Sequence, residues 1–276
     1  MKKKGIRIVH YVSPSVYAWR RGRAKKIGKF VDLLLCLFPF EPGFYRDTEL
    51  KAVYVGHPKA SAIKIGKSDL AKSRSRERLE LPTGNRVLAV LPGSRISEIN
   101  ILTPILFEFI KKMNMKYKDL FFVFHSTQEH VQLLQKQLLD EGLKNCGAIA
   151  DEKIKSHILK SSVFAVAKSG TISLEICNSK IPSIIIYKMG AINFFIVKML
   201  VKVKFANIIN IAAGEEVIPE LLQSKCNAKD IYNSVDKLMN DKTALENQLN
   251  KTQSIISNFK TDKSSEIASS ILNDYI

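Results

Sequence analysis

From residue 86 onward, short apolar runs alternate with longer amphipathic stretches, and this alternation limits the fold more than any other feature. The first run, 87–91, is almost wholly apolar, as expected of a strand buried on both faces. Further strands are predicted at 120–124, 147–150, 163–167 and 182–187, and helices at 97–116, 128–142, 152–161 and 172–179. Alternation at these lengths predicts an α/β fold in which helices cover both faces of a parallel sheet.

Two of the predicted strands end in a glycine turn that leads into a helix. Pro92-Gly93-Ser94-Arg95 follows the first strand, and Lys168-Ser169-Gly170-Thr171 follows the run 163–167. Unpaired N–H groups at a helix start favour an anion, and Arg95 can hold phosphate through two hydrogen bonds. Ligands of open parallel sheets bind at such loops. The residues predicted to bind an anion are Gly93, Ser94, Arg95, Ser169, Gly170 and Thr171.

Ordinary structural roles are open alternatives for several of these residues. Ser169 or Thr171 is suited to cap the following helix. Glu175, one turn into that helix, is placed either to bind a sugar or ribose hydroxyl or only to complement the helix dipole. Asn210 follows a strand-like run, 206–209, at the same loop level. It suits either a ligand diphosphate or sugar, or turn formation, which the pattern alone favours.

Residues 1–58 show a second, thinner alternation of strands and helices. Strands are predicted at 5–12, 31–37 and 52–55, a basic helix at 17–30, and a short helix ending near residue 45. Residues 59–84 are polar and basic without a strong period, and we expect a linker there. The expected domains are therefore 1–58, a ligand-binding domain at 85–225, and a helical tail, 226–276, that packs back on the domains.

The net charge of +17 points to nucleic acid, an anionic membrane or phosphorylated substrates as partners. Nucleic acid is not expected, because the lysines are spread out and aromatic residues do not alternate with them as stacking platforms. The four cysteines, at 36, 146, 177 and 226, form no CxxC pair and no metal-ligand spacing with the five histidines. We therefore expect reduced thiols, no metal and no cofactor.

The segment from residue 190 to 205 interleaves bulky apolar residues with lysines and holds no acidic residue. It is too short and too charged to span a bilayer, but such a helix can lie in a membrane interface. The membrane-facing candidates are Phe194, Phe195, Lys198 and Lys202. The alternative, which the pattern alone favours, is an ordinary core helix whose lysines face solvent.

A series of motifs resembles the lipid-A-disaccharide synthases. The motifs are HYVSPSVYAWR at 10–20, LFPFE at 37–41, GHP at 56–58, LPGSRISEI at 91–99, KSGT at 168–171, Asn210 and EVIPELLQ at 216–223. They occur in the family's order over nearly the whole chain, which makes the resemblance specific. It implies an inverting glycosyltransferase with two Rossmann-like domains, the GT-B type, of which the N-terminal one is incomplete here.

The resemblance also implies a reaction and a site. The family transfers diacylglucosamine from UDP-2,3-diacylglucosamine to 2,3-diacylglucosamine 1-phosphate, which gives the β-1,6-linked lipid A disaccharide and UDP. The two glycine turns would hold the diphosphate, Glu175 would bind the ribose, and Asn210 would lie close to the diphosphate. Because both substrates are acylated and phosphorylated, the protein is expected at the cytoplasmic face of the inner membrane of a Gram-negative cell.

The resemblance departs from the family at the N-terminus. Family members carry, before the HYVSPS block, further βα units and the carboxylate thought to deprotonate the acceptor hydroxyl. Here no acidic residue precedes Asp32, so the general base is expected in a missing N-terminal segment. We expect little or no turnover by this chain alone, and either a second copy or a separate N-terminal fragment as partner.

Two other functions are weighed against this one. The chain is alternatively a catalytically inactive UDP-sugar-binding fragment or subunit, or, less favoured, a basic nucleic-acid-binding protein. Retention on a nucleic-acid column at moderate salt would support the last of these, whereas competition by UDP would support a UDP-sugar site.

Overall fold

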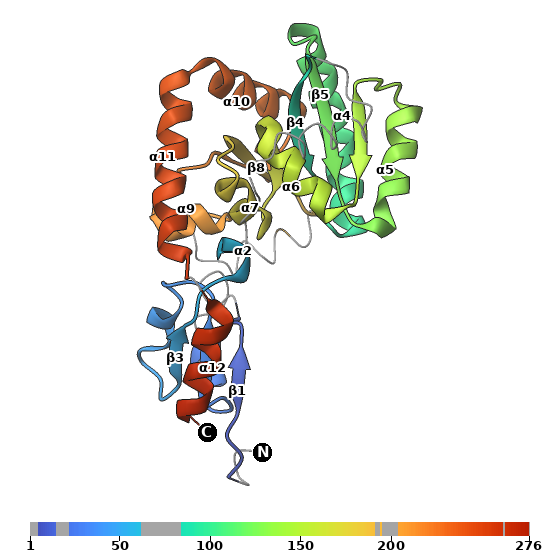
Figure 1. Ribbon diagram of the computed structural model, residues 1–276. Coiled ribbons are helices and arrows are strands. Elements are labelled where there is room, and N and C mark those ends of the chain that lie inside the picture. The colour runs from blue at the N-terminus through green and yellow to red at the C-terminus, as the bar shows by residue number, and fades with distance from the viewer. Residues whose placement is uncertain are drawn as a thin grey trace. The chain divides into compact units, whose positions relative to one another are not determined.

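The computed structural model describes residues 5–14, 22–61, 84–190, 194, 204–261 and 263–275, and the chain divides into two compact units (Figure 1). Unit 1 comprises Met1–Ile63, Ala191–Ala206 and Ser254–Ile276, and unit 2 comprises Lys64–Gly190 and Asn207–Gln253. Each unit has a parallel sheet with helices packed against it, which confirms the expected α/β fold class. The division between the units falls inside the helical tail, after residue 253.

In the described part of unit 2, six parallel strands form one sheet in the order β6-β5-β4-β7-β8-β9. The strands are β4 (Arg86–Leu91), β5 (Leu120–His125), β6 (Cys146–Ile149), β7 (Ser162–Lys168), β8 (Ser183–Tyr187) and β9 (Glu220–Leu222). The chain moves outward from β4 to β6, returns to place β7 beside β4, and then moves outward in the other direction. This is the doubly wound order, whose switch point lies between β4 and β7.

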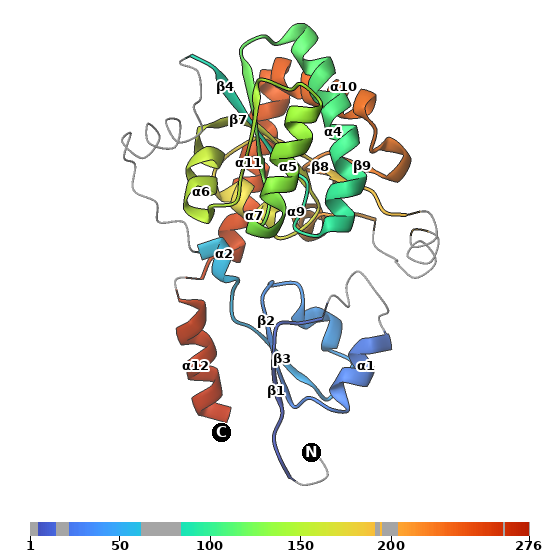
Figure 2. The same ribbon diagram turned by 90° about the vertical axis from the view of Figure 1, so that its right-hand side faces the viewer.

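Helices cover both faces of this sheet (Figures 1 and 2). The helices of unit 2 are α4 (Ile96–Lys116), α5 (Gln128–Asp140), α6 (Glu152–Ser161), α7 (Ile172–Asn178), α9 (Ile208–Ala213) and α10 (Ala228–Asn240), with a short turn, η3, at Gln223–Lys225. Helix α11 (Lys242–Phe259) begins in unit 2, and its residues from 254 onward belong to unit 1. Leu88 and Val90 of β4 pack in the core formed with α4, α5 and α10. Val87 packs on the opposite face, where Ile158 of α6 covers it. Successive side chains of a strand point to opposite faces of the sheet, so alternate residues of β4 pack in the apolar layers on either side.

Two short elements near the end of unit 2 differ from expectation. The run 206–209, predicted as a strand, instead enters helix α9, because the Asn207 side chain accepts a hydrogen bond from Ile209 N (2.8 Å) and caps that helix. Conversely, β9 was not predicted. It has three residues, and its pairing with β8, from Ile185 opposite Glu220, makes it a strand. A segment this short carries no period of its own.

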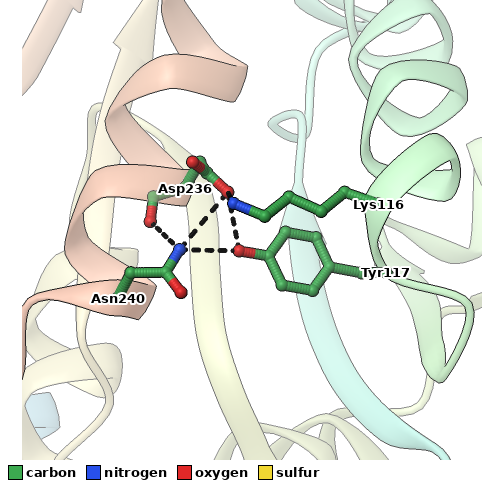
Figure 3. Close-up of polar contacts among 4 residues, drawn as sticks. All are labelled: Lys116, Tyr117, Asp236 and Asn240. Carbon is green, nitrogen blue, oxygen red and sulfur yellow. Dashed lines mark hydrogen bonds and ion pairs between the residues drawn. The ribbon is translucent and has the colours of Figure 1, made fainter.

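A polar network joins the end of α4 to α10 (Figure 3). Asp236 Oδ1 accepts hydrogen bonds from Lys116 Nζ and Tyr117 Oη, each at 2.6 Å. Asn240, one turn further along α10, donates from Nδ2 to Tyr117 Oη at 2.8 Å. The hydrogen bond from Lys116 is the main cause that lowers the pKa of Asp236 below its ordinary value. These contacts add polar links to the apolar packing of α4 and α10 in the shared core.

In the described part of unit 1, three parallel strands pair in the order β1-β2-β3. The elements of this unit are β1 (Val9–Tyr11), α1 (Gly22–Gly28), β2 (Leu33–Cys36), η2 (Pro42–Tyr45), β3 (Lys51–Tyr54), α2 (Pro58–Ser61) and α12 (Ser264–Tyr275). Leu34 and Cys36 of β2 pack with Ala24 of α1 and Tyr45 of η2. Helix α12 lies on the side of this sheet away from α1 (Figure 2).

Some sequence predictions lie outside the described residues. They are the first part of the helix expected at 17–30, the linker over 62–83, and three of the membrane-facing candidates, Phe195, Lys198 and Lys202. Phe194 is described and half-buried. Within the ranges that the structure describes, none of the helices is long and apolar enough to cross a membrane.

Candidate ligand-binding site

The two predicted glycine turns lie next to each other at the switch point of unit 2. One turn leaves β4 and the other leaves β7, and these strands are paired up to Leu91 opposite Ala167. Because the strands are parallel, both turns emerge at the same edge of the sheet. The fold therefore brings together the six predicted turn residues, which are Gly93, Ser94, Arg95, Ser169, Gly170 and Thr171.

The turn after β4 is shaped by close packing. Gly93 has a φ of +113°, a backbone conformation that residues with a side chain rarely adopt, and a Cβ here would also displace the Glu98 carboxylate. Ser126 Oγ donates a hydrogen bond to Gly93 O at 3.1 Å, which ties the turn to the segment after β5. Ser94 and Arg95 remain exposed beside the first turn of α4. The turn is thus fixed in position and open to a ligand.

The turn after β7 is less constrained. Ser169 N donates to Ile186 O at 3.1 Å and so continues the contact between β7 and β8. Thr171 occupies the N-cap position of α7, but its side chain makes no capping hydrogen bond. A Cβ at Gly170 would meet no atom closer than Lys168 O at 4.0 Å. Gly170 and Thr171 are both exposed, so this turn also offers its polar groups to a ligand.

A carboxylate lies between the cations of the two turns. Glu98 Oε1 accepts hydrogen bonds from Arg95 Nη1 at 3.0 Å and from Lys168 Nζ at 2.9 Å. Burial acts to raise the pKa of Glu98, but the hydrogen bonds and charges of Lys168 and Arg95 together lower it below its ordinary value. The carboxylate is therefore ionised at neutral pH, and it joins the end of β7 to the start of α4.

Glu175 lies one turn into α7, beyond the second glycine turn, and is buried. Its Oε2 lies 2.7 Å from Lys155 Nζ, which also lies 2.5 Å from Glu152 Oε2. Burial acts to lower the pKa of Lys155, but the hydrogen bonds and charges of Glu152 and Glu175 raise it above its ordinary value. Lys155 therefore stays charged and holds the Glu175 carboxylate in place.

His125, at the end of β5, completes this polar group. Burial is the main cause that lowers its pKa to about 4, and the charge of Lys155 adds to the effect. Its Nε2 lies 3.6 Å from Glu152 Oε1, but the ring is neutral at physiological pH, so the two do not form an ion pair there.

Asn210 does not occupy the loop position that the sequence suggested. It lies inside α9 and is fully buried. Its Oδ1 accepts from Val217 N and Ile218 N, each at 2.9 Å, and its Nδ2 donates to Ile218 O (2.7 Å) and Glu220 Oε1 (2.8 Å). These four bonds use the whole capacity of an amide side chain. Asn210 therefore stabilises the 217–220 turn, which is the alternative that the sequence pattern alone favoured.

Three charged residues of this edge were not predicted as site residues. Glu98 lies in the motif at 91–99, three residues after Arg95, and Lys168 lies in the motif at 168–171, directly before Ser169. Lys155 carries no sequence signal, because a lysine in an amphipathic helix is expected on the solvent face. In the ranges that the structure describes, no group of three or more His, Cys, Asp or Glu side chains is placed to hold a metal ion.

Comparison with known proteins gives matches over nearly the whole chain. Residues 1–272 match the family described as lipid-A-disaccharide synthetase. The lipid-A-disaccharide synthase of Sulfurihydrogenibium sp. (strain YO3AOP1) is 36% identical over 258 residues, which cover 90% of this chain and 66% of that protein. The enzyme of the same name from Acinetobacter baylyi is 33% identical over 255 residues, which cover 88% and 63%. The chain thus spans about two thirds of the length of these relatives.

Solved structures share the fold at low sequence identity. The UDP-GlcNAc 2-epimerase from Neisseria meningitidis, bound to UDP-GlcNAc, superposes with a TM-score of 0.68 at 12% identity. The match covers 99% of this chain and 71% of the epimerase chain. It supports the expected architecture of Rossmann-like units with parallel sheets.

Proposed function

The chain belongs to the lipid-A-disaccharide synthetase family, and on that premise we propose that unit 2 binds the UDP-sugar donor of the family's reaction. The diphosphate would lie at the switch point between β4 and β7, against the turns at 93–95 and 169–171. The observation that carries this proposal is the convergence of both glycine turns at one edge of a doubly wound sheet. Arg95, whose side chain is 76% exposed, is accessible to a phosphate there.

The chemistry of the proposed reaction calls for such a site. When the sugar is transferred, the bond to the β-phosphate breaks and negative charge builds up on the departing UDP. Donors that are already oriented stabilise that charge best. The exposed N–H groups at the start of α4, those of the second turn, and the Arg95 guanidinium would supply them without a metal.

We assign the ribose to Glu175. A carboxylate accepts hydrogen bonds from neutral hydroxyl groups, and Glu175 follows the second turn by a single helical turn. The ion pair with Lys155 supports this assignment, because it holds the buried carboxylate in a fixed orientation. Asn210 is left out of the ligand contacts, since its side chain is fully bonded within the protein.

For the whole reaction we propose a glycosyltransferase activity in lipid A biosynthesis. Diacylglucosamine would pass from UDP-2,3-diacylglucosamine to 2,3-diacylglucosamine 1-phosphate, giving the β-1,6 disaccharide and UDP. Acylated, phosphorylated substrates lie in a membrane surface, so the basic protein would act as a peripheral protein at the cytoplasmic face of the inner membrane. The names of the matching relatives support this proposal.

Titration of the full chain with UDP tests the donor site. Changing Arg95 to Ala is expected to weaken UDP binding by about 1.5–3 kcal/mol, the effect of losing one charge-assisted hydrogen bond. Arg86→Ala is the matched control, because Arg86 is the first residue of β4 and therefore lies at the end of that strand away from the turn that carries Arg95. An Arg95→Ala variant that binds UDP like the unchanged protein, or a control that is equally weakened, would count against the site.

A further inference from the structure

We infer that Lys168 is a further binding residue for the diphosphate, and that Glu98 holds Lys168 beside Arg95. The inference rests on the proposed function, because it concerns the same site. It begins with the three charged side chains that meet at the switch point. Lys168 ends β7, whereas Arg95 and Glu98 stand at the start of α4.

A single oxygen atom joins the two cations. Glu98 Oε1 lies 2.9 Å from Lys168 Nζ and 3.0 Å from Arg95 Nη1. The side chains of Lys168 and Glu98 are 16% and 14% exposed, in contrast to the exposed Arg95. Because both cations contact the same oxygen, they are held side by side between the two glycine turns.

Tyr187 restrains Lys168 from a second direction. It ends β8, the next strand of the sheet, and Lys168 Nζ lies 5.3 Å from the centroid of its ring. An ammonium group is attracted to the face of an aromatic ring at this distance. The ammonium group of Lys168 is therefore held by both Glu98 and the ring of Tyr187.

The charges of Arg95, Glu98 and Lys168 do not sum to zero. One carboxylate faces two cations, so a net positive charge remains at the place where the diphosphate is proposed to bind. Glu98 compensates the largely buried ammonium of Lys168, so the charge left over is that of the exposed Arg95 guanidinium. A diphosphate has two phosphoryl groups, and two neighbouring cations can each hold one of them. Lys168 thus has the position and the charge expected of a residue that binds the diphosphate.

Glu98 acts as an anion that the protein itself supplies to the site. It takes the hydrogen bonds of Arg95 and Lys168 that phosphoryl oxygens would otherwise accept, and it carries the same sign of charge as the ligand. It therefore stabilises the empty protein and opposes ligand binding. A purely structural carboxylate would instead support both folding and binding.

The first test replaces Lys168 in the full chain and measures UDP and UMP affinity by titration. Lys168→Met keeps the apolar stem, removes the charge, and is expected to weaken UDP binding about tenfold or more. The loss for UMP, which has a single phosphate, is expected to be smaller. Lys168→Arg, which keeps the charge, is expected to retain most of the affinity.

Lys112→Met is the matched control for this test, because it removes the same charge from the exposed face of α4. Unchanged UDP binding by Lys168→Met, or an equal loss in the control, would overturn the inference while leaving the proposed function intact. Failure of the unmodified chain to bind UDP would overturn both.

The second test replaces Glu98 by Gln and measures thermal unfolding together with UDP affinity. The melting temperature of the empty protein is expected to fall, since two ion pairs are lost. UDP affinity is expected to rise several-fold, since a competing negative charge is removed. A fall in both quantities would show that Glu98 only supports the fold, and would overturn its assignment as the internal anion.

Discussion

At the scale of single residues, Asn210 is the clearest case of a polar side chain committed to the fold. Its loss in Asn210→Ala would leave the buried N–H groups of Val217 and Ile218 without their acceptor. Each unsatisfied buried group costs about 1–3 kcal/mol, so we expect the free energy of unfolding to fall by about 3 kcal/mol or more. Urea denaturation measures this change. Asn233→Ala, at an exposed site of α10, should change it by no more than about 0.5 kcal/mol.

In unit 1, Glu41 is a buried acid that accepts hydrogen bonds from Leu37 N (2.9 Å) and Phe38 N (3.0 Å). Burial raises its pKa from 4.5 to about 7, although both hydrogen bonds act in the opposite direction. Between these two values the folded state keeps a proton that the unfolded state releases. The free energy of unfolding should therefore decrease as the pH rises through that window.

Glu41→Gln is expected to remove this pH dependence, since the amide oxygen can still accept from both N–H groups. Urea denaturation at about pH 5 and about pH 8 measures it, and the variant should gain stability relative to the unchanged protein at the higher pH. Glu49→Gln, at an exposed position of the same unit, should leave the pH dependence as it was. An unaltered slope in Glu41→Gln would contradict the assignment.

At the scale of elements, the contact between α4 and α10 includes a polar network centred on the ionised Asp236 (Figure 3). The hydrogen bond from Lys116 is the main cause that lowers the pKa of Asp236 in the folded protein. The ionised Asp236 therefore stabilises the folded state above the pKa of an Asp in the unfolded chain, about 3.9, and this stabilisation is lost as the pH falls below that value. Asp236→Asn should therefore destabilise the protein near neutral pH and have little effect in acid.

Urea denaturation of the Asp236→Asn variant and of the unchanged protein, at neutral pH and in acid, measures this difference in stability. The expected loss is small, because Lys116 lies in solvent and surface ion pairs are screened. Asp140→Asn, at the exposed end of α5, serves as the control and should show no such trend. A destabilisation of equal size at every pH would mean that packing, rather than charge, holds the two helices together.

At the scale of the whole molecule, the charge of +17 and the segment at 190–205 together predict binding to anionic membranes. Replacing Phe194 and Phe195 by Ser, and Lys198 and Lys202 by Gln, should release the folded protein from vesicles of phosphatidylcholine and phosphatidylglycerol. Cosedimentation with these vesicles measures the effect.

The control for this experiment removes the same kinds of side chain elsewhere. Met115 and Leu139 are each 80% exposed, and Lys112 and Lys136 are exposed lysines of the same two helices. With the apolar pair changed to Ser and the lysines to Gln, this variant should still bind. Equal loss in both variants would mean that total charge, and not the segment, attaches the protein.

The sequence by itself determined most strands and helices of unit 2, because apolar periodicity is a local property that burial imposes on each element. It also placed both glycine turns at strand ends, where the exposed N–H groups follow from the chain direction. The sequence did not predict the short elements correctly. Three residues at 220–222 became a strand only through pairing with β8, and 206–209 entered a helix capped by Asn207.

Only the tertiary structure decided which charged groups meet. Glu98 and Lys168 are 70 positions apart in the sequence, and Lys155 lies 20 positions before Glu175. No local pattern relates such residues, since their contacts exist only after the strands have taken the order that places β7 beside β4. For the same reason the sequence left open whether Asn210 binds a ligand or forms a turn, and only the fold shows its side chain bonded to the 217–220 turn. Which side chains pair with one another is decided by long-range contacts in the fold, whereas strands and turns form from local sequence.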